Sequence, residues 1–330
     1  MVRIGILGAA RIAPAALVKP AATRSDVEVV GVAARDTAKA SAFAAKHGLA
    51  TVFDSYDALV DDPSVDAVYN PLPNGLHGRW TLRALEAGKH VLCEKPFTAN
   101  ADEARSVATA AAARPDLVVM EAFHWRYHPL ARNIVEVVES GAIGTLRRID
   151  TSMCIPLPKR NDIRYQWSLA GGSLMDVGCY ALHMNRTFAG GVPVVRSARA
   201  KSMRSDARID RWITAELEYG EVRGSIRAAL WSGDVLRIGA RIVGTDGEIR
   251  VLNPTQPGIY HRAVLRNTDG RRNVGVSDKR ASYWHQLDAF VAAVGGDHDR
   301  NLTDTNEAVI TMDLIDAVYR AAGLPVREPT

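Results

Sequence analysis

Short apolar strands alternate with helix-compatible stretches through the first 121 residues, and this alternation limits the possible folds more than any other feature. Such alternation is typical of an α/β, doubly wound parallel sheet with helices on both faces. Ligands of such sheets bind beside the carboxyl ends of the strands, so we expect a site in the loops that follow them. The expected strands are residues 2–7, 27–33, 51–53, 66–69, 90–94 and 117–121.

The first strand is followed by a turn of small residues, from Gly8 to Ala13, which leads into a helix. A strand, a tight turn and a helix N-terminus offer backbone N–H groups and a positive dipole end to a pyrophosphate. The turn matches the pattern G-x-G-x-x-G/A imperfectly, because Ala10 stands where a second glycine is usual. A small-residue turn before any buried helix gives a similar sequence pattern, so a purely structural turn is the alternative. The residues expected to contact a dinucleotide here are Gly8, Ala10, Arg11 and Ile12.

The residues after the second strand indicate which dinucleotide is bound. A carboxylate at this position would accept a hydrogen bond from the 2′-hydroxyl of the adenosine ribose and would select NAD. This chain has Ala34 and Arg35 there instead, and a guanidinium without an acid suits a 2′-phosphate. The sequence therefore favours NADP as the cofactor. NAD stays possible if Arg35 is only a surface charge.

Two later loops at the same predicted sheet edge carry polar side chains. The loop 70–77 holds Asn74 and His77, which can hydrogen-bond a cofactor, although Asn74 can equally cap the next helix. Lys95 follows the fifth strand just before a proline that stiffens the turn, so it is expected to project a cation toward the nicotinamide position. The other residues of these loops expected beside the cofactor are Pro71, Leu72 and Glu94.

A second group of polar residues lies in the stretch 171–183, after two glycines and a serine. We expect a helix that begins near residue 174. It would place Asp176, Tyr180 and His183 at i, i+4 and i+7, on one stripe of its surface. The neighbouring stripe is apolar and supplies the packing face, so the acid, the phenol and the imidazole point away from the core. An amphipathic helix whose wet face happens to contain these residues is the alternative.

Beyond residue 145 the pattern changes to strands with alternating faces and short turns. This pattern predicts an α+β domain with a large, mostly antiparallel open sheet. We expect a dinucleotide-binding domain at 1–123 and a substrate-binding and oligomerisation domain at 124–330, whose last helices can pack back on the first. One face of the sheet can pack on the 171–183 helix. The other carries Trp212 and further apolar residues, which predicts a homodimer or homotetramer through this sheet.

Composition excludes several classes of function. The net charge is only +4 and the arginines are dispersed, which argues against a nucleic-acid partner. No apolar run reaches the length of a membrane span, and the first residues are typical of a strand rather than of a signal peptide. The three cysteines are far apart and fit reduced thiols of a cytoplasmic protein. His124 and His128 could suggest zinc, but no third ligand lies nearby, so no metal is expected.

Four segments carry a resemblance that covers essentially the whole chain. They are the start Gly-Ile-Leu-Gly-Ala-Ala-Arg-Ile-Ala, Glu94-Lys95-Pro96, Arg126-Tyr127-His128-Pro129 and residues 176–183. In their order and spacing they resemble the glucose-fructose oxidoreductase, inositol dehydrogenase and MocA (Gfo/Idh/MocA) family. The loop 71–77 and Glu121-Ala122-Phe123 look most like the branch with dimeric dihydrodiol dehydrogenase and NADP-dependent xylose dehydrogenase.

The resemblance implies that Lys95 is the central catalytic lysine, that its bond to Pro96 is cis, and that Asp176 corresponds to the family's helix aspartate. Many members carry histidine four residues after that aspartate, where this chain has Tyr180, with His183 three residues further on. The proton can therefore be handled by Tyr180, our first choice, or by His183. A nearby ammonium such as that of Lys95 would favour the phenolate of Tyr180.

These expectations converge on an NADP-dependent dehydrogenase that acts on a secondary alcohol or hemiacetal carbon of a sugar, a polyol or a trans-dihydrodiol. The resemblance directs Arg126 toward the nicotinamide ribose or the substrate. Two alternatives stay open: a redox-silent NADP-binding sensor or corepressor, which would be expected to lose the lysine, and an NAD-dependent glycosidase. The residues expected on the substrate side are Trp125 and, in the irregular insert 156–168, Tyr165 and Trp167.

Overall fold

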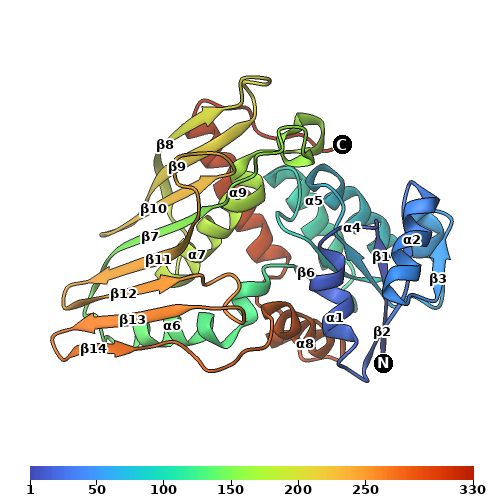
Figure 1. Cartoon of the computed structure of the whole chain (residues 1–330), viewed down its shortest axis with the longest axis horizontal. Helices are drawn as coiled ribbons and strands as arrows, with labels where there is room; N and C mark the ends of the chain where they lie inside the picture. Colours follow the sequence, from blue (N-terminus) through green and yellow to red (C-terminus); the bar gives the residue numbers. More distant parts are fainter. The chain divides into compact units, whose positions relative to one another are not determined.

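The computed structural model describes all 330 residues, from Met1 to Thr330. The chain divides into two compact units (Figure 1), with its last two residues shared between them. Unit 1 comprises Met1–His124 and Tyr283–Val309, and unit 2 comprises Trp125–Ser282 and Ile310–Glu328. None of the helices combines the length and the apolar character that a membrane crossing needs.

Unit 1 is built on a six-stranded parallel sheet with the strand order β3-β2-β1-β4-β5-β6. This confirms the predicted doubly wound sheet. The chain progresses outward from β1 in both directions, so the crevice between β1 and β4 is the point at which such sheets bind ligands. The strands are β1 (Val2–Leu7), β2 (Val27–Ala33), β3 (Thr51–Phe53), β4 (Ala67–Asn70), β5 (His90–Cys93) and β6 (Val119–Glu121).

Side-chain caps begin three helices of unit 1. Asp36, Ser55 and Asn100 each accept a hydrogen bond from the backbone N–H three residues later, which satisfies a donor that the helix itself leaves unpaired. A π-helical turn, Pro14–Val18, precedes the short α1. The helices begun in this unit are α1 (Lys19–Ala21), α2 (Thr37–His47), α3 (Tyr56–Asp61), α4 (His77–Glu86), α5 (Ala101–Ala112) and α9 (Thr305–Ala321); α8 (Ser282–Val294) lies in it apart from its first residue.

Unit 2 contains an eight-stranded sheet with the order β14-β13-β12-β11-β7-β10-β9-β8, which Figure 1 shows side by side. All neighbouring pairs are antiparallel except β7 and β10, which confirms the predicted mostly antiparallel sheet. The short edge strand β14 was not expected. The strands are β7 (Leu146–Cys154), β8 (Val194–Ser202), β9 (Asp210–Tyr219), β10 (Val222–Ala229), β11 (Arg237–Gly244), β12 (Gly247–Leu252), β13 (Arg262–Asn267) and β14 (Gly270–Asn273).

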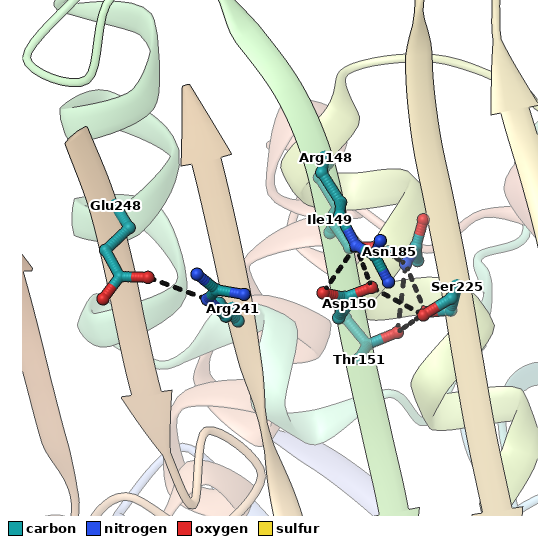
Figure 2. A network of polar contacts seen from close by, with 8 residues as sticks. All are labelled: Arg148, Ile149, Asp150, Thr151, Asn185, Ser225, Arg241 and Glu248. Carbon is teal, nitrogen blue, oxygen red and sulfur yellow. Dashed lines mark hydrogen bonds and ion pairs between the residues drawn. The ribbon is translucent and has the colours of Figure 1, made fainter. Parts of the chain in front are cut away.

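The inner face of this sheet holds helix α7 (Cys179–Ala189), as predicted, and α6 (Pro129–Glu139) lies beside it. The contact between α7 and the sheet includes polar anchors (Figure 2). Asn185 Nδ2 donates to the carbonyl oxygens of Ile149 and Ser225, both at 3.0 Å, and so bridges the parallel pair β7 and β10. Thr151 Oγ1 donates to the Ala181 carbonyl at 2.8 Å. Buried hydrogen bonds of this kind fix the axial position of the helix on the sheet.

The outer face of the same sheet is covered by charge pairs. Arg148 Nε lies 2.9 Å from Asp150 Oδ1, and Arg241 Nε lies 2.7 Å from Glu248 Oε2 (Figure 2). Even Trp212 is overlaid by the Lys201 ammonium, 5.2 Å from the ring centroid. The expected apolar outer face is confirmed only in part: Trp212 and the exposed Leu252 and Val194 lie on it, but charge pairs within and between the strands satisfy other outward positions. Oligomerisation through this sheet stays a prediction.

Candidate functional site

Gly8 shapes the turn after β1. Its φ of +90° lies in a region that side chains rarely adopt, and a Cβ there would lie 3.1 Å from the side chain of Leu72. Ala10 N donates to the Gly8 carbonyl at 2.8 Å, and Ala13 N donates to the Ala10 carbonyl at 3.1 Å. Arg11 is exposed at the tip of this turn. A close-packed glycine turn that leads into a helical N-terminus fits a dinucleotide pyrophosphate.

The residues after β2 meet a side chain that the sequence did not suggest. Ala34 is half-buried and Arg35 is exposed. The Tyr56 hydroxyl lies 3.9 Å from the position that a Cβ on Gly8 would take, and it also interacts with Arg35. Burial raises the pKa of Tyr56, while Arg35 opposes that shift. Tyr56 therefore joins the β1 turn to the residue predicted to select a 2′-phosphate. As the first residue of α3 after a serine cap, it carries no sequence signal of such a role.

His77 ties together the loops that follow β4 and β5. Its ring is only 1% exposed, with Nδ1 2.8 Å from the Pro96 carbonyl oxygen and Nε2 2.7 Å from that of Leu72. Burial lowers the pKa of His77 to about 4, against the opposing effect of the two carbonyls. Because both nitrogens face the chain's own backbone, His77 supports the loops and presents no ring nitrogen to a ligand. Asn74, predicted to hydrogen-bond a cofactor or to cap the next helix, is half-buried in the short 3-10 turn before it.

Lys95 follows β5 at the same sheet edge. The Lys95–Pro96 peptide bond is cis, as the resemblance implied. The Lys95 side chain is half-buried, whereas Glu94 is buried and accepts a hydrogen bond from the Tyr69 hydroxyl at 2.8 Å. The neighbouring Glu121 is fastened through its main chain to Thr303, which donates to its carbonyl at 2.6 Å. The carboxyl edge thus contains an ammonium group set among buried, hydrogen-bonded residues.

The candidate helix of unit 2 begins near residue 174, as expected, but its first turn has a different geometry. Residues Leu174–Gly178 form a π-helical turn, and the regular α-helix starts at Cys179. π-helical turns are frequent at functional sites. Asp176 lies in this turn, and its Oδ1 is 2.9 Å from Arg164 Nε. Tyr180, in the first turn of α7, is 5% exposed.

His183 lies one turn further along α7, packed edge-on against the ring of Trp125 at a centroid distance of 5.4 Å. It is only 2% exposed. Burial, together with the positive charges of Arg186 and Arg126, lowers the pKa of His183 well below its usual value. The imidazole is therefore neutral throughout the neutral range, and adding a proton to it is costly. Trp125 itself is fully buried.

The insert before the helix contacts it through an arginine. Arg164 bridges Asp162 and Asp176, at 3.0 and 2.9 Å. The predicted substrate residues of the insert are engaged within unit 2. The Tyr165 hydroxyl donates to the Leu157 carbonyl at 3.0 Å, and the Trp167 ring is in contact with the guanidinium groups of Arg208 and Arg327, at 4.7 and 4.9 Å from its centroid. Three charged residues that the sequence did not single out are therefore further functional candidates: Arg164, which pairs with Asp176, and Arg327, which pairs with the buried Asp210.

Comparisons with known proteins agree with this architecture. Residues 2–123 match the model of the oxidoreductase family with an NAD-binding Rossmann fold, and residues 131–250 match the GFO/IDH/MocA C-terminal domain. The chain is 38% identical to D-xylose 1-dehydrogenase (NADP(+)) 2 of Haloferax volcanii, over 96% of both chains. It is 35% identical to trans-1,2-dihydrobenzene-1,2-diol dehydrogenase of Macaca fuscata fuscata, over 70% of this chain and 68% of that one.

A solved structure extends the likeness to three dimensions. The crystal structure of a 3-ketoreductase from Actinomadura kijaniata, in complex with NADP and TDP-benzene, matches with a TM-score of 0.88 at 27% identity, over 97% of both chains. The resemblance inferred from the four segments is confirmed, including its branch. With both domain models matched in succession and a relative aligned over nearly its full length, this chain belongs to the Gfo/Idh/MocA oxidoreductase family.

Proposed function

We propose that this chain is an NADP(H)-dependent oxidoreductase that transfers a hydride between nicotinamide and the secondary alcohol or hemiacetal carbon of a sugar, a polyol or a trans-dihydrodiol. The observation that carries the proposal is the carboxyl edge of the unit 1 sheet, where the Gly8 turn, Arg35 and Lys95 each follow a strand. The names of the D-xylose and trans-dihydrodiol dehydrogenases support this range of substrates.

Different residues of unit 1 are proposed to bind different parts of the cofactor. The Gly8 turn would receive the pyrophosphate on its backbone N–H groups, and Arg35, with Tyr56 beside it, would bind the 2′-phosphate. The loops after β4 and β5 would hold the nicotinamide end, which accepts or donates the hydride when bound. The further residues of unit 1 proposed to contact the cofactor are Ala10, Arg11, Ile12, Ala34, Pro71, Leu72, Asn74 and Glu94, and Arg126 is the one proposed from unit 2.

The proton is proposed to move through Tyr180, with His183 as the second candidate. The buried, charge-surrounded position of His183 favours Tyr180, because an imidazole whose pKa is this low holds a transferred proton poorly. Lys95 would stabilise the negative charge that develops on the substrate oxygen when its proton leaves. Asp176, held by Arg164, would accept a hydrogen bond from a neighbouring substrate hydroxyl.

A substrate panel tests the proposal. Pentoses, hexoses, polyols and trans-dihydrodiols are each incubated with NADP⁺ and with NAD⁺, and formation of the reduced cofactor is followed by absorbance. We expect turnover with at least one class, and a kcat/KM about tenfold or more higher for NADP⁺, because a charge-assisted phosphate contact is lost with NAD⁺. NADP binding without turnover of any of these substrates would favour a sensor. Release of reducing sugar without net cofactor reduction would favour a glycosidase.

A further inference from the structure

A carboxylate from a distant strand lies at the start of the candidate helix. Asp210, the first residue of β9, is fully buried, and its Oδ2 accepts hydrogen bonds from Ser173 Oγ and from Leu174 N, both at 2.7 Å. Its Oδ1 accepts from the Tyr319 hydroxyl at 2.9 Å and from Arg327 Nη2 at 2.7 Å. Both oxygens are therefore satisfied inside unit 2, as a buried charge requires.

This carboxylate replaces the missing cap of the helix. Ser173, at the N-cap position, makes no capping bond with its own side chain; its hydroxyl donates to Asp210 instead. The first N–H groups of a helix have no partner within the helix, and a negative charge beside them is favourable because of the helix dipole. Asp210 supplies both the acceptor and the charge. The position of the helix start thus depends on a residue 36 positions away along the chain.

Arg327 holds this carboxylate in place. Its guanidinium is fully buried and donates through Nη2 to Asp210, through Nε to the Gly171 carbonyl at 2.7 Å and through Nη1 to the Pro325 carbonyl at 2.8 Å. It also lies over the rings of Tyr319 and Trp167, at 3.9 and 4.9 Å from their centroids. One side chain near the end of the chain therefore connects β9, α9 and the loop before the candidate helix.

The two glycines before the helix make this contact possible. Gly172 has a φ of +139°, and a Cβ there would collide with the Asp210 carboxylate, with Arg327 Nη2 at 2.6 Å. A Cβ on Gly171 would lie 2.6 Å from the Arg164 carbonyl oxygen. The glycines thus bring the loop directly against the ion pair. The same loop carries Arg164, whose side chain pairs with Asp176.

We propose that Arg327 and Asp210 are positioning residues of the reaction, which set the helix start and through it the orientation of Asp176 and Tyr180. The inference rests on the proposed function, in which those two residues act on the substrate. Arg327 and Asp210 act through Ser173, Leu174 and the glycine loop. Because the cofactor residues proposed above lie almost entirely in unit 1, loss of the pair should affect substrate turnover and leave NADP binding intact.

The test compares two arginines of the same chain segment. Arg327→Met removes the buried guanidinium and keeps most of its length, whereas Arg320→Met removes an exposed guanidinium whose contact with Asp316 is 3.6 Å long. For each variant, kcat and KM for the substrate that the panel above identifies are measured per NADP-binding molecule, so that unfolded protein does not count. We expect Arg327→Met to lower kcat about tenfold or more, with the affinity for NADP unchanged within about twofold, and Arg320→Met to behave as wild type. Arg327→Lys, which keeps the charge without the planar fork, should recover only part of kcat.

Ser173→Ala keeps the test decisive if Arg327→Met does not fold. It removes one donor to Asp210 from a small side chain and should lower kcat several-fold without changing NADP affinity. Amide hydrogen exchange over residues 172–180 gives a readout that needs no substrate, and it should become faster in both variants. Wild-type kcat in the folded variants would overturn the inference, even if exchange becomes faster. If the wild-type enzyme turns over no substrate of the panel, the proposed function is refuted instead. Hydrogen exchange over residues 172–180 that is the same in the variants as in the wild type would then overturn the capping role as well.

Discussion

The two units hold their candidate residues by different means. In unit 1 the residues follow successive strand ends, and main-chain atoms contribute to their support: the His77 ring lies between two backbone carbonyls, and Glu121 N donates to the Thr303 carbonyl at 2.9 Å. In unit 2 charged side chains from separate segments do this work, through Arg164, Asp210 and Arg327. Main-chain support survives most substitutions, whereas side-chain support can be altered by one. We therefore expect single substitutions to alter the unit proposed to bind substrate more readily than the unit proposed to bind the cofactor, which suits a family whose relatives bear the names of different substrates.

The largest effect on kcat is expected from replacing Lys95, and it tests whether the sheet edge of unit 1 carries the chemistry. Lys95→Met should lower kcat about 10³-fold, because the charge at the developing oxyanion is lost, while NADP binding and the melting temperature stay near wild type. Lys89 is the matched control: its ammonium donates to the carbonyls of Asp62 and Val65, at 2.9 and 2.7 Å. Lys89→Met should lower the melting temperature and leave kcat unchanged. Near-normal turnover in Lys95→Met would contradict the assignment.

The second prediction concerns His77 and the main-chain support of unit 1. The folded state holds the pKa of His77 at about 4, compared with 6.5 for an unperturbed histidine. Well above pH 6.5 the ring is neutral in both states and the shift has no effect on stability. Between 6.5 and 4 the unfolded chain binds the proton more readily, so stability falls as the pH falls, by roughly 3 kcal/mol in total. Urea unfolding across this range measures the loss. His77→Gln should reduce the slope, and an unchanged slope would show that other groups cause it.

A third prediction separates the two proton-handling candidates of unit 2. Tyr180→Phe should lower kcat about 10²-fold, because the hydroxyl that exchanges the proton is removed. His183→Asn should lower kcat only a few-fold. The pH profiles of the wild type and of this variant should show the same ionisations, since the pKa of His183 lies well below the neutral range. Steady-state kinetics as a function of pH provide both measurements. The opposite order of effects would identify His183 as the acid/base group.

The smallest effect is expected from replacing Arg35, and it concerns the preference between NADP⁺ and NAD⁺. Arg35 is the exposed side chain of unit 1 on which we propose that this preference depends. Arg35→Asp should change the ratio of kcat/KM for NADP⁺ and NAD⁺ by about tenfold or more toward NAD⁺, because the carboxylate repels the 2′-phosphate and accepts from a 2′-hydroxyl. Arg11→Asp, in the neighbouring turn, should weaken both cofactors without favouring either. A preference that does not move in Arg35→Asp would assign the choice to another residue, with Tyr56 as the next to examine.

Much of unit 1 could be predicted from the sequence, because local patterns determine it. An apolar strand, a glycine turn and a helix place Gly8 at the sheet edge, and the same pattern places Lys95 at the end of β5. Tyr56 escaped prediction because nothing in its neighbourhood distinguishes it from any first helical residue. On the open sheet the alternation was interpreted correctly, but the chemistry of its outer face only in part, since a period of two gives no information on whether outward arginines find acidic partners.

Asp210 and Arg327 could not be predicted. Along β9 the inward positions are Ile213, Ala215 and Leu217, so strict alternation would place Asp210 on the outer face with Trp212. The pairing with β8 is irregular there. Asp210 lies opposite Ser202, whereas regular pairing would place it opposite Met203, and this irregularity turns its side chain inward. Its partner is 117 residues away in an irregular segment. A contact of that separation leaves no periodic trace in the sequence.

The parallel seam between β7 and β10 bears on how the chain folds. β8 to β10 form one antiparallel meander and β11 to β14 another, and each can form locally from short hairpins between consecutive strands. β7 joins the two across long loops, so we expect it to pair late, and Asn185 of α7 completes its hydrogen bonds only when both β7 and β10 are in place. Until then β10 and β11 have bare edges of the kind that aggregates, and we expect misfolding of this protein to begin there.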